Sequence, residues 1–267
     1  MRTLSGWKKN AIGIWLSAVS VFALYTAPFG IMQPRIQRGV HLLFLLPMAF
    51  VLFPATKKSA PDRIPVYDWI LAFLSLVPAL YIIFNNGDLS SRFEFVDPLT
   101  PLQVALGALN IILILEAIRR AVVPAMTILI CSFFVYVFAA PHFSGVFYCK
   151  PLPISELIEM EYMLTDSGIY GSITGISATF VALFVIFGSI MEGTQTGKFF
   201  TDLACRLTGK SRGGPAKVAV VSSAFLGSIS GVAAANVYAT GTFTIPMMKR
   251  LGYRPQFAGA VEAVASS

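Results

Sequence analysis

Long runs without charged residues alternate with short polar segments along the whole chain. Seven runs contain no Asp, Glu, Lys or Arg: 11–32, 39–56, 69–87, 99–115, 121–149, 167–191 and 218–248. A helix needs about 20 apolar residues to cross the hydrocarbon core of a bilayer. The apolar residues in these runs are consecutive, as in Ile111–Leu115, and do not alternate as the strands of a membrane barrel would. We therefore predict an all-α polytopic membrane protein.

The composition excludes several other classes of protein. Only 12% of the 267 residues are charged, whereas a soluble domain carries about 25% and needs them to cover its surface. The segment Gly209-Lys210-Ser211 lacks the preceding glycine of an ATP-binding loop, and the two histidines and three cysteines give no metal-binding spacing. We therefore expect no enzymatic activity and no cofactor.

The basic residues predict an orientation. If the N-terminus is cytoplasmic, the first six runs each cross once and the seventh run returns to the side from which it starts, 16 of the 20 Lys and Arg side chains lie on the cytoplasmic side. This bias follows the positive-inside rule of inner-membrane proteins. The net charge of +7 then reflects topology in a lipid bilayer, and we expect no nucleic-acid partner.

The segment 143–166 is predicted to face the periplasm and is acidic. Its carboxylates could form a docking surface for a periplasmic partner, or simply belong to a solvated loop: Glu156, Glu159, Glu161 and Asp166.

The seventh run, 218–248, differs from the others. Its 31 residues are too long for one straight crossing and too short for two, and basic residues flank both ends, at Lys217 and at Lys249-Arg250. A re-entrant helical hairpin with both ends in the cytoplasm satisfies length and charge together. The alternative is a single long tilted helix with a kink at a glycine.

The small and polar residues of this run are the candidate site. They lie near its middle: Gly227, Ser228, Ser230, Gly231, Asn236 and Thr240. A broken helix exposes backbone carbonyl groups to cations and amide groups to anions. Oxygen ligands suit a hard cation, so we predict an ion and substrate site here, with Na⁺ held by Ser228, Ser230 and Asn236. The alternative is that these small residues only allow close helix packing.

Segments in the second half of the chain resemble a transporter family. These segments are Arg212–Val221, Gly227–Gly231, Phe243–Tyr253 and Phe257–Ser266, with Thr165–Phe180 and Gly197–Phe200 before them. The first three resemble the first hairpin region of the large permease subunit of TRAP transporters, the tripartite ATP-independent periplasmic transporters, and Phe257–Ser266 resembles the helix that follows it. The segments 165–180 and 197–200 also resemble the subclass in which the small and large subunits are fused.

The resemblance implies a function and a division of the chain. Residues 1–121 would form a four-helix domain like the small subunit, and residues 122–267 would begin an elevator-type transport domain. The fold would have six transmembrane helices plus the re-entrant helical hairpin. The implied function is Na⁺-coupled import of an organic anion, a carboxylate, delivered by a periplasmic substrate-binding protein. Because members of this family continue into a second hairpin, we expect the chain to be an N-terminal fragment at Ser267. The alternative is a membrane scaffold or assembly subunit that does not transport.

Overall fold

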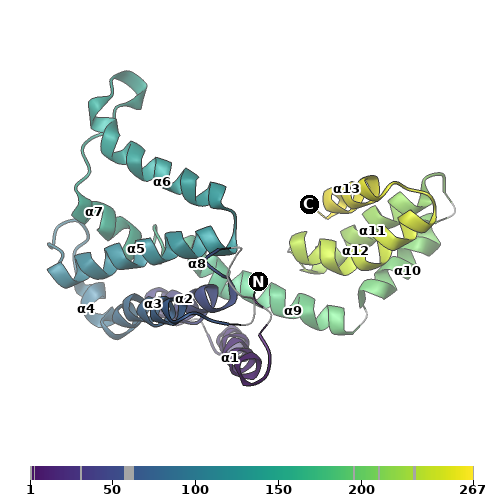
Figure 1. Cartoon of the computed structure of the whole chain (residues 1–267), viewed down its shortest axis with the longest axis horizontal. Coiled ribbons are helices and arrows are strands. Elements are labelled where there is room, and N and C mark those ends of the chain that lie inside the picture. The colour runs from purple at the N-terminus through teal and green to yellow at the C-terminus, as the bar shows by residue number, and fades with distance from the viewer. Residues whose placement is uncertain are drawn as a thin grey trace. The chain divides into compact units, whose positions relative to one another are not determined.

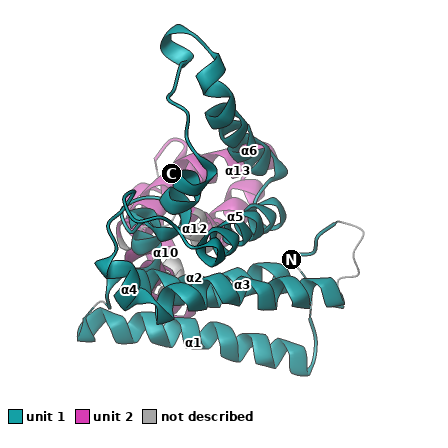
Figure 2. Cartoon of the chain, turned by 90° about the vertical axis from the view of Figure 1, so that its left-hand side faces the viewer, with its two compact units in different colours: residues 1–178 teal, residues 179–267 magenta. Residues whose placement is uncertain are grey.

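The computed structural model describes residues 2, 4–30, 32–56, 63–194, 196–209, 211–230 and 233–266. These residues fold into helices and contain no strand, which confirms the predicted all-α class. The chain divides into two compact units, residues 1–178 and residues 179–267 (Figure 2). The sequence analysis placed a different boundary, after residue 121, between a part like the small subunit and a part like the large subunit. That boundary stays a prediction.

Unit 1 contains five helical stretches, among the described residues, that are long and apolar enough to cross a membrane. They are α1 (Trp7–Phe29), α2 (Pro34–Leu52), α3 (Val66–Phe84), α5 (Pro101–Ala121) and Pro124–His142, which joins α6 (Pro124–Ala139) to η1 (Ala140–His142). They coincide with the first five charge-free runs. Proline opens α2, α5 and α6, a position where its missing N–H costs no helical hydrogen bond.

Shorter elements connect these helices. They are α4 (Asn86–Ser91), η2 (Gly145–Phe147), α7 (Ile154–Ile158) and the π-helical turn η3 (Glu159–Met163). The sixth predicted crossing, 167–191, is helical from Ser172 to Gly193 through α8 (Ser172–Ile176), the π-helical turn η4 (Ser177–Val181) and α9 (Ala182–Gly193). A turn occupies the first residues of that run, so its apolar helix, Ser172–Phe187, is shorter than the five in unit 1.

The helices of unit 1 pack along the chain order, α1 on α2, α2 on α3 and α3 on α5 (Figure 1). One apolar cluster joins α2, α3 and α5 through Phe50, Val51, Ala72 and Leu113, all of them buried. α1 adds the indole N–H of Trp15, which donates to the carbonyl of Phe44 at 2.9 Å. In contrast, no described side chain of α6 is buried, as expected for a helix that faces lipid.

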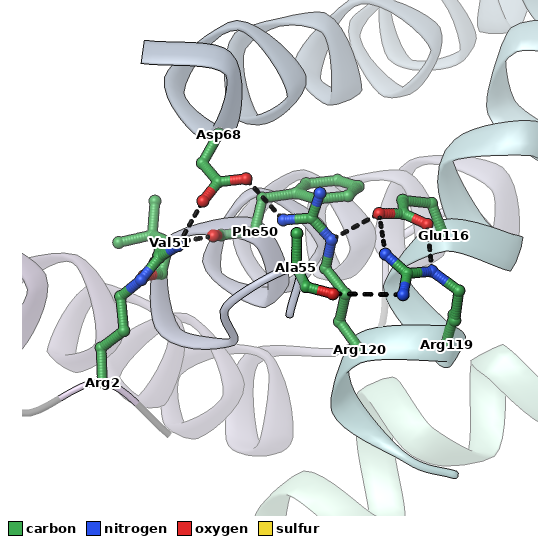
Figure 3. A network of polar contacts seen from close by, with 8 residues as sticks. All are labelled: Arg2, Phe50, Val51, Ala55, Asp68, Glu116, Arg119 and Arg120. Atoms are coloured by element: carbon green, nitrogen blue, oxygen red, sulfur yellow. Dashed lines mark hydrogen bonds and ion pairs between the residues drawn. The ribbon is translucent and has the colours of Figure 1, made fainter. Parts of the chain in front are cut away.

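A charged network closes one end of these helices (Figure 3). The carboxylate of Asp68 is buried and pairs with Arg2 and, at 2.6 Å, with Arg120. Glu116 pairs with Arg119 at 2.7 Å and with Arg120 at 2.6 Å, which confirms the pairing expected from their spacing on one helix. The network joins the chain start to α3 and to the end of α5, where the sequence predicts the cytoplasmic side.

At the other end, the segment after α7 packs onto α3 and α5. Tyr162 is fully buried, and its hydroxyl donates to the carbonyl of Pro78 at 2.8 Å. Gly107 makes room for Tyr162 and Ile158, since a Cβ atom there would lie 3.1 Å from the ring of Tyr162 and closer still to Ile158. Two arginines of α2 hold the same segment by its main chain. Arg35 donates to the carbonyl of Met163 at 3.1 Å, and Arg38 donates to that of Tyr170 at 2.8 Å and to that of Thr165.

This packing corrects the predicted acidic docking surface. The four carboxylates do not share one exposed face, because Glu159 is buried and pairs with Arg92 at 2.9 Å. The Glu159 carboxylate also accepts the backbone N–H of Phe95 at 2.9 Å. Glu161 is half-buried and Asp166 is exposed. The sequence suggested a surface role for Glu159 because it is one of four carboxylates within eleven residues of a segment predicted to face the periplasm.

Unit 2 contains α9, α10 (Thr196–Thr208), α11 (Gly214–Ser230), α12 (Ala233–Arg250) and α13 (Pro255–Ala265). α11 packs against α10, α12 and α13, and α12 also packs against α13. Small buried residues, Ala219 on α11 and Ala258 on α13, meet Met248 of α12 at the centre of this unit.

Candidate functional site

The two arms of the predicted hairpin, α11 and α12, pack side by side in opposite directions. The hydroxyl oxygens of Ser223 and Thr240 lie 3.1 Å apart, and one turn further along, Gly227 faces Asn236. A Cβ atom at Gly227 would lie 3.1 Å from the side-chain nitrogen of Asn236, so glycine allows the two helices to approach closely here. A single continuous helix over 218–248 is therefore wrong, and the paired helices agree with the predicted hairpin.

The predicted site residues fall into two groups. Asn236 and Thr240 are buried between α11 and α12. Ser228 is exposed, and its hydroxyl donates to the carbonyl of Phe225 on its own helix at 2.7 Å. Gly231 and the side chain of Ser230 lie outside the described residues.

Asn236 is held by only one of its two polar side-chain atoms. Its amide nitrogen donates to the carbonyl of Ser223 at 3.0 Å. Its amide oxygen is buried and accepts no hydrogen bond from the described residues. A buried acceptor without a donor is unfavourable by about 1–3 kcal/mol, and such atoms are rare in folded proteins. This oxygen is therefore available to a ligand.

The structure adds a residue that the sequence analysis did not include in the site. Glu262 of α13 is fully buried, and its carboxylate accepts hydrogen bonds from the hydroxyl groups of Thr240 and Thr244. Ser223 donates to the same carboxylate at 3.0 Å, and Ser266 donates to it at 3.4 Å. A lone carboxylate in a short apolar helix is the signal that could have indicated it, because buried acids in membrane helices are usually functional.

The site thus offers oxygen atoms of several kinds. These are the carboxylate of Glu262, the hydroxyl groups of Ser223, Thr240 and Thr244, and the amide oxygen of Asn236. Hard cations such as Na⁺ prefer oxygen ligands. Among the described residues, no group of three or more His, Cys, Asp and Glu side chains is placed to hold a metal ion.

Comparison with known families gives a match over more than half of the chain. The sequence profile of the family described as Tripartite ATP-independent periplasmic transporter, DctM component, matches residues 109–267. The matched region begins inside α5 and includes the whole of α11, α12 and α13.

Curated proteins with similar sequences include three from bacteria. A Haemophilus influenzae protein named "Putative TRAP transporter large permease protein" is 37% identical over 73 residues, which are 27% of this chain and 17% of that protein. The uncharacterized protein y4mL of Sinorhizobium fredii is 36% identical over 83 residues, 31% of this chain and 20% of its own. The uncharacterized protein YgiK of Salmonella typhimurium is 28% identical over 92 residues, 34% of this chain and 21% of its own.

The chain spans about a fifth of the length of these relatives. No solved structure shows a significant match.

Proposed function

Because the chain belongs to the DctM component family of the tripartite ATP-independent periplasmic transporters, we propose that it is a permease part of a Na⁺-coupled secondary transporter. The cargo is an organic carboxylate, and a periplasmic binding protein delivers it. The permease lies in the bacterial inner membrane with its N-terminus in the cytoplasm. The excess of Lys and Arg on the predicted cytoplasmic segments supports this orientation.

One observation carries the proposal: polar side chains are buried between α11 and α12. Asn236 and Thr240 are polar side chains buried in a long charge-free run, where a polar atom without a partner is costly. The amide oxygen of Asn236 accepts no hydrogen bond from the described residues, which supports a role as a ligand for a cation. Helix ends near 230 and 233 add backbone carbonyl and amide groups that helical hydrogen bonds do not use.

The site residues of the proposal have separate roles. The backbone carbonyl groups around Gly227 and Gly231 contribute oxygen atoms to Na⁺ and to the carboxylate cargo, together with the side chains of Ser228, Ser230, Asn236 and Thr240. Neutral oxygens at the hairpin bind Na⁺ weakly, which suits a carrier that must release the ion in each cycle.

Uptake by the full-length permease in liposomes tests the proposal. With the cognate binding protein outside and Na⁺ varied, we expect carboxylate uptake to require an inward Na⁺ gradient. Asn236→Ala should raise the half-saturating Na⁺ concentration. Ser189→Ala is the matched control, because this exposed hydroxyl donates to the carbonyl of Val185 on its own helix and, among the described residues, to no other group. Uptake without Na⁺ dependence, or an Asn236→Ala protein with the wild-type Na⁺ response, would contradict it.

A further inference from the structure

The first half of α1 packs loosely against the rest of unit 1. The buried side chains of α1, Ala23 and Thr26, both lie in its second half, where the side-chain amide of Gln37 on α2 donates to the Thr26 hydroxyl at 3.4 Å. Near the middle of α1, Trp15 is bonded to the carbonyl of Phe44 on α2. Between the start of α1 and Trp15, no described side chain of the helix is buried.

An apolar groove lies between this part of α1 and the two helices beside it, α2 and α3 (Figure 2). Its volume is about 220 Å³, and every side chain that lines it is aliphatic, aromatic or a thioether. Its walls include Ala11, Ile12 and Trp15 on α1 and Trp69, Phe73 and Leu76 on α3. Protein interiors are close-packed, and an apolar space gives water too few hydrogen-bond partners. The groove therefore requires an apolar occupant from outside the described residues.

The groove begins at the ends of α1 and α3 that carry the first residues of each helix. Lys8 precedes Ala11, Ile12 and Trp15 by three, four and seven residues, so it shares the face of α1 that lines the groove. Seven residues of helix are about 10 Å long, and the groove extends about this far from Lys8 toward the middle of the membrane. Trp69 lines the same end and is exposed, as indole side chains at the level of lipid headgroups are.

This end of the groove is positively charged. Lys8 and Lys9 are exposed, and neither pairs with a carboxylate of the described residues. The carboxylate of Asp68, next to Trp69 in the chain, is buried and pairs with both Arg2 and Arg120, so it does not neutralise the two lysines. An anion at this end of the groove would therefore meet two lysine ammonium groups that have no partner in the described part of the chain.

We propose that this groove binds an anionic phospholipid, with one acyl chain between α1 and α3 and the phosphate group at Lys8 and Lys9. An acyl chain is the apolar occupant that a bilayer supplies at this depth. Basic side chains at the membrane surface attract anionic headgroups in preference to zwitterionic ones. The assignment of the lipid to the cytoplasmic leaflet rests on the proposed orientation, whereas the binding itself does not.

Indole fluorescence can report the acyl chain without any transport. The purified full-length permease is reconstituted in phosphatidylcholine vesicles that contain an increasing fraction of phosphatidylglycerol with brominated acyl chains, which quench an indole that they contact. The difference between the wild type and Trp15→Phe isolates the signal of Trp15 in the groove. Brominated phosphatidylcholine is the reference lipid. We expect half of the quenching at a fraction of phosphatidylglycerol about 10-fold lower than that of the reference lipid, because each lysine attracts an anionic lipid about 5-fold.

Variants assign the effect to the lysines and to the groove. Lys8→Gln and Lys9→Gln should each raise the half-quenching fraction of phosphatidylglycerol by about 5-fold. Lys217→Gln, which removes an exposed lysine of α11, should leave it unchanged. Ala11→Phe fills the groove and should remove the quenching of Trp15 by both lipids. Ala27→Phe, the same change at an exposed position further along α1, should not.

The outcomes are distinct. Equal half-quenching fractions for the two brominated lipids would overturn the proposal, because the lysines would then select no headgroup. A Trp15 signal that neither lipid quenches would also overturn it, since another protein segment or a second copy of the chain would then cover the groove. Equal effects of Lys8→Gln and Lys217→Gln would overturn it as well. If Ala11→Phe does not fold, the variants of the exposed lysines carry the test. Selective quenching in a permease without Na⁺-driven uptake would support the lipid site and contradict only the proposed transport function.

Discussion

The guanidinium group of Arg92 lies 2.9 Å from the carboxylate of Glu159, and the two side chains are only 12% and 6% exposed. The pair joins the loop between α4 and α5 to the π-helical turn η3, which lies within the region matched by the family profile. The N-terminal helices and the family-matched segment are thereby fixed to each other by charge as well as by apolar packing.

Breaking this ion pair should be costly. Glu159→Gln leaves Arg92 buried with a neutral partner and weakens the bond to the N–H of Phe95. We expect the free energy of unfolding in detergent micelles to fall by about 3 kcal/mol, as for other buried pairs that lose one partner.

A more exposed ion pair provides the control for this measurement. Arg119 is 39% exposed and its partner Glu116 is 26% exposed, so Arg119→Ala should cost about 1 kcal/mol or less. Equal losses in the two variants would show that burial does not set the strength of the Arg92–Glu159 pair.

Gly107 should not tolerate a side chain. In Gly107→Ala the new Cβ atom would meet Ile158 at 2.4 Å and the ring of Tyr162 at 3.1 Å. The segment must shift away from α5, which should destabilise the protein by about 1–3 kcal/mol. The same change at Gly13 meets nothing within 4 Å and should stabilise α1 by up to about 1 kcal/mol. A stable Gly107→Ala protein in the same unfolding assay would mean that this close approach is not maintained.

The half-buried Glu161 predicts a pH dependence. Burial raises the pKa of the Glu161 carboxyl above its ordinary value of about 4.3. Between the unfolded and the folded pKa, the folded protein therefore binds more protons than the unfolded chain. This contribution to stability is fully present below the ordinary pKa and is lost as the pH rises through the raised pKa.

Replacement of the carboxyl group tests this effect. Glu161→Gln should raise the unfolding midpoint at neutral pH and reduce the fall in stability between mildly acidic and neutral pH. Asp166→Asn, which removes an exposed carboxylate from the same segment, controls for the loss of a negative charge. If the stability of Glu161→Gln varies with pH as in the wild type, other groups cause the pH dependence.

Both ends of the paired helices α11 and α12 should face the cytoplasm. Ser211 and Leu251 flank them and are exposed, so each can be replaced by cysteine after Cys131, Cys149 and Cys205 are removed. An impermeant thiol reagent added to intact cells should label neither position, and both should react after the cells are opened. Labelling of exactly one position in intact cells would show that 218–248 crosses the membrane once.

Local patterns in the sequence predicted the helices of this protein well. Charge-free length indicated α1, α2, α3 and α5, and Pro124 marked the boundary after α5. The pairing of Glu116 with Arg119 and Arg120 followed from spacing within one helix. These features depend on neighbours in the chain, which periodicity and charge describe directly.

Contacts between distant segments were not predictable in the same way. Glu159 was assigned to a surface because its partner, Arg92, lies in another loop. Glu262 was left out of the candidate site because only the packing of α13 against α12 brings it to Thr240 and Thr244. In both cases the partners of a buried carboxylate lie on a segment that only the tertiary structure brings close. No spacing rule along the sequence identifies such partners.

The hydrogen bonds from Arg35 and Arg38 to the backbone of the segment 163–170 determine which changes of sequence this segment tolerates. The two guanidinium groups donate to carbonyl oxygens, which every amino acid carries, so they do not recognise the side chains of the residues that they hold. A substitution at the partly exposed Thr165 therefore keeps these bonds. An insertion or deletion of one residue would instead change the spacing of the carbonyl groups that the two arginines hold, so we expect this segment to tolerate a change of residue better than a change of length.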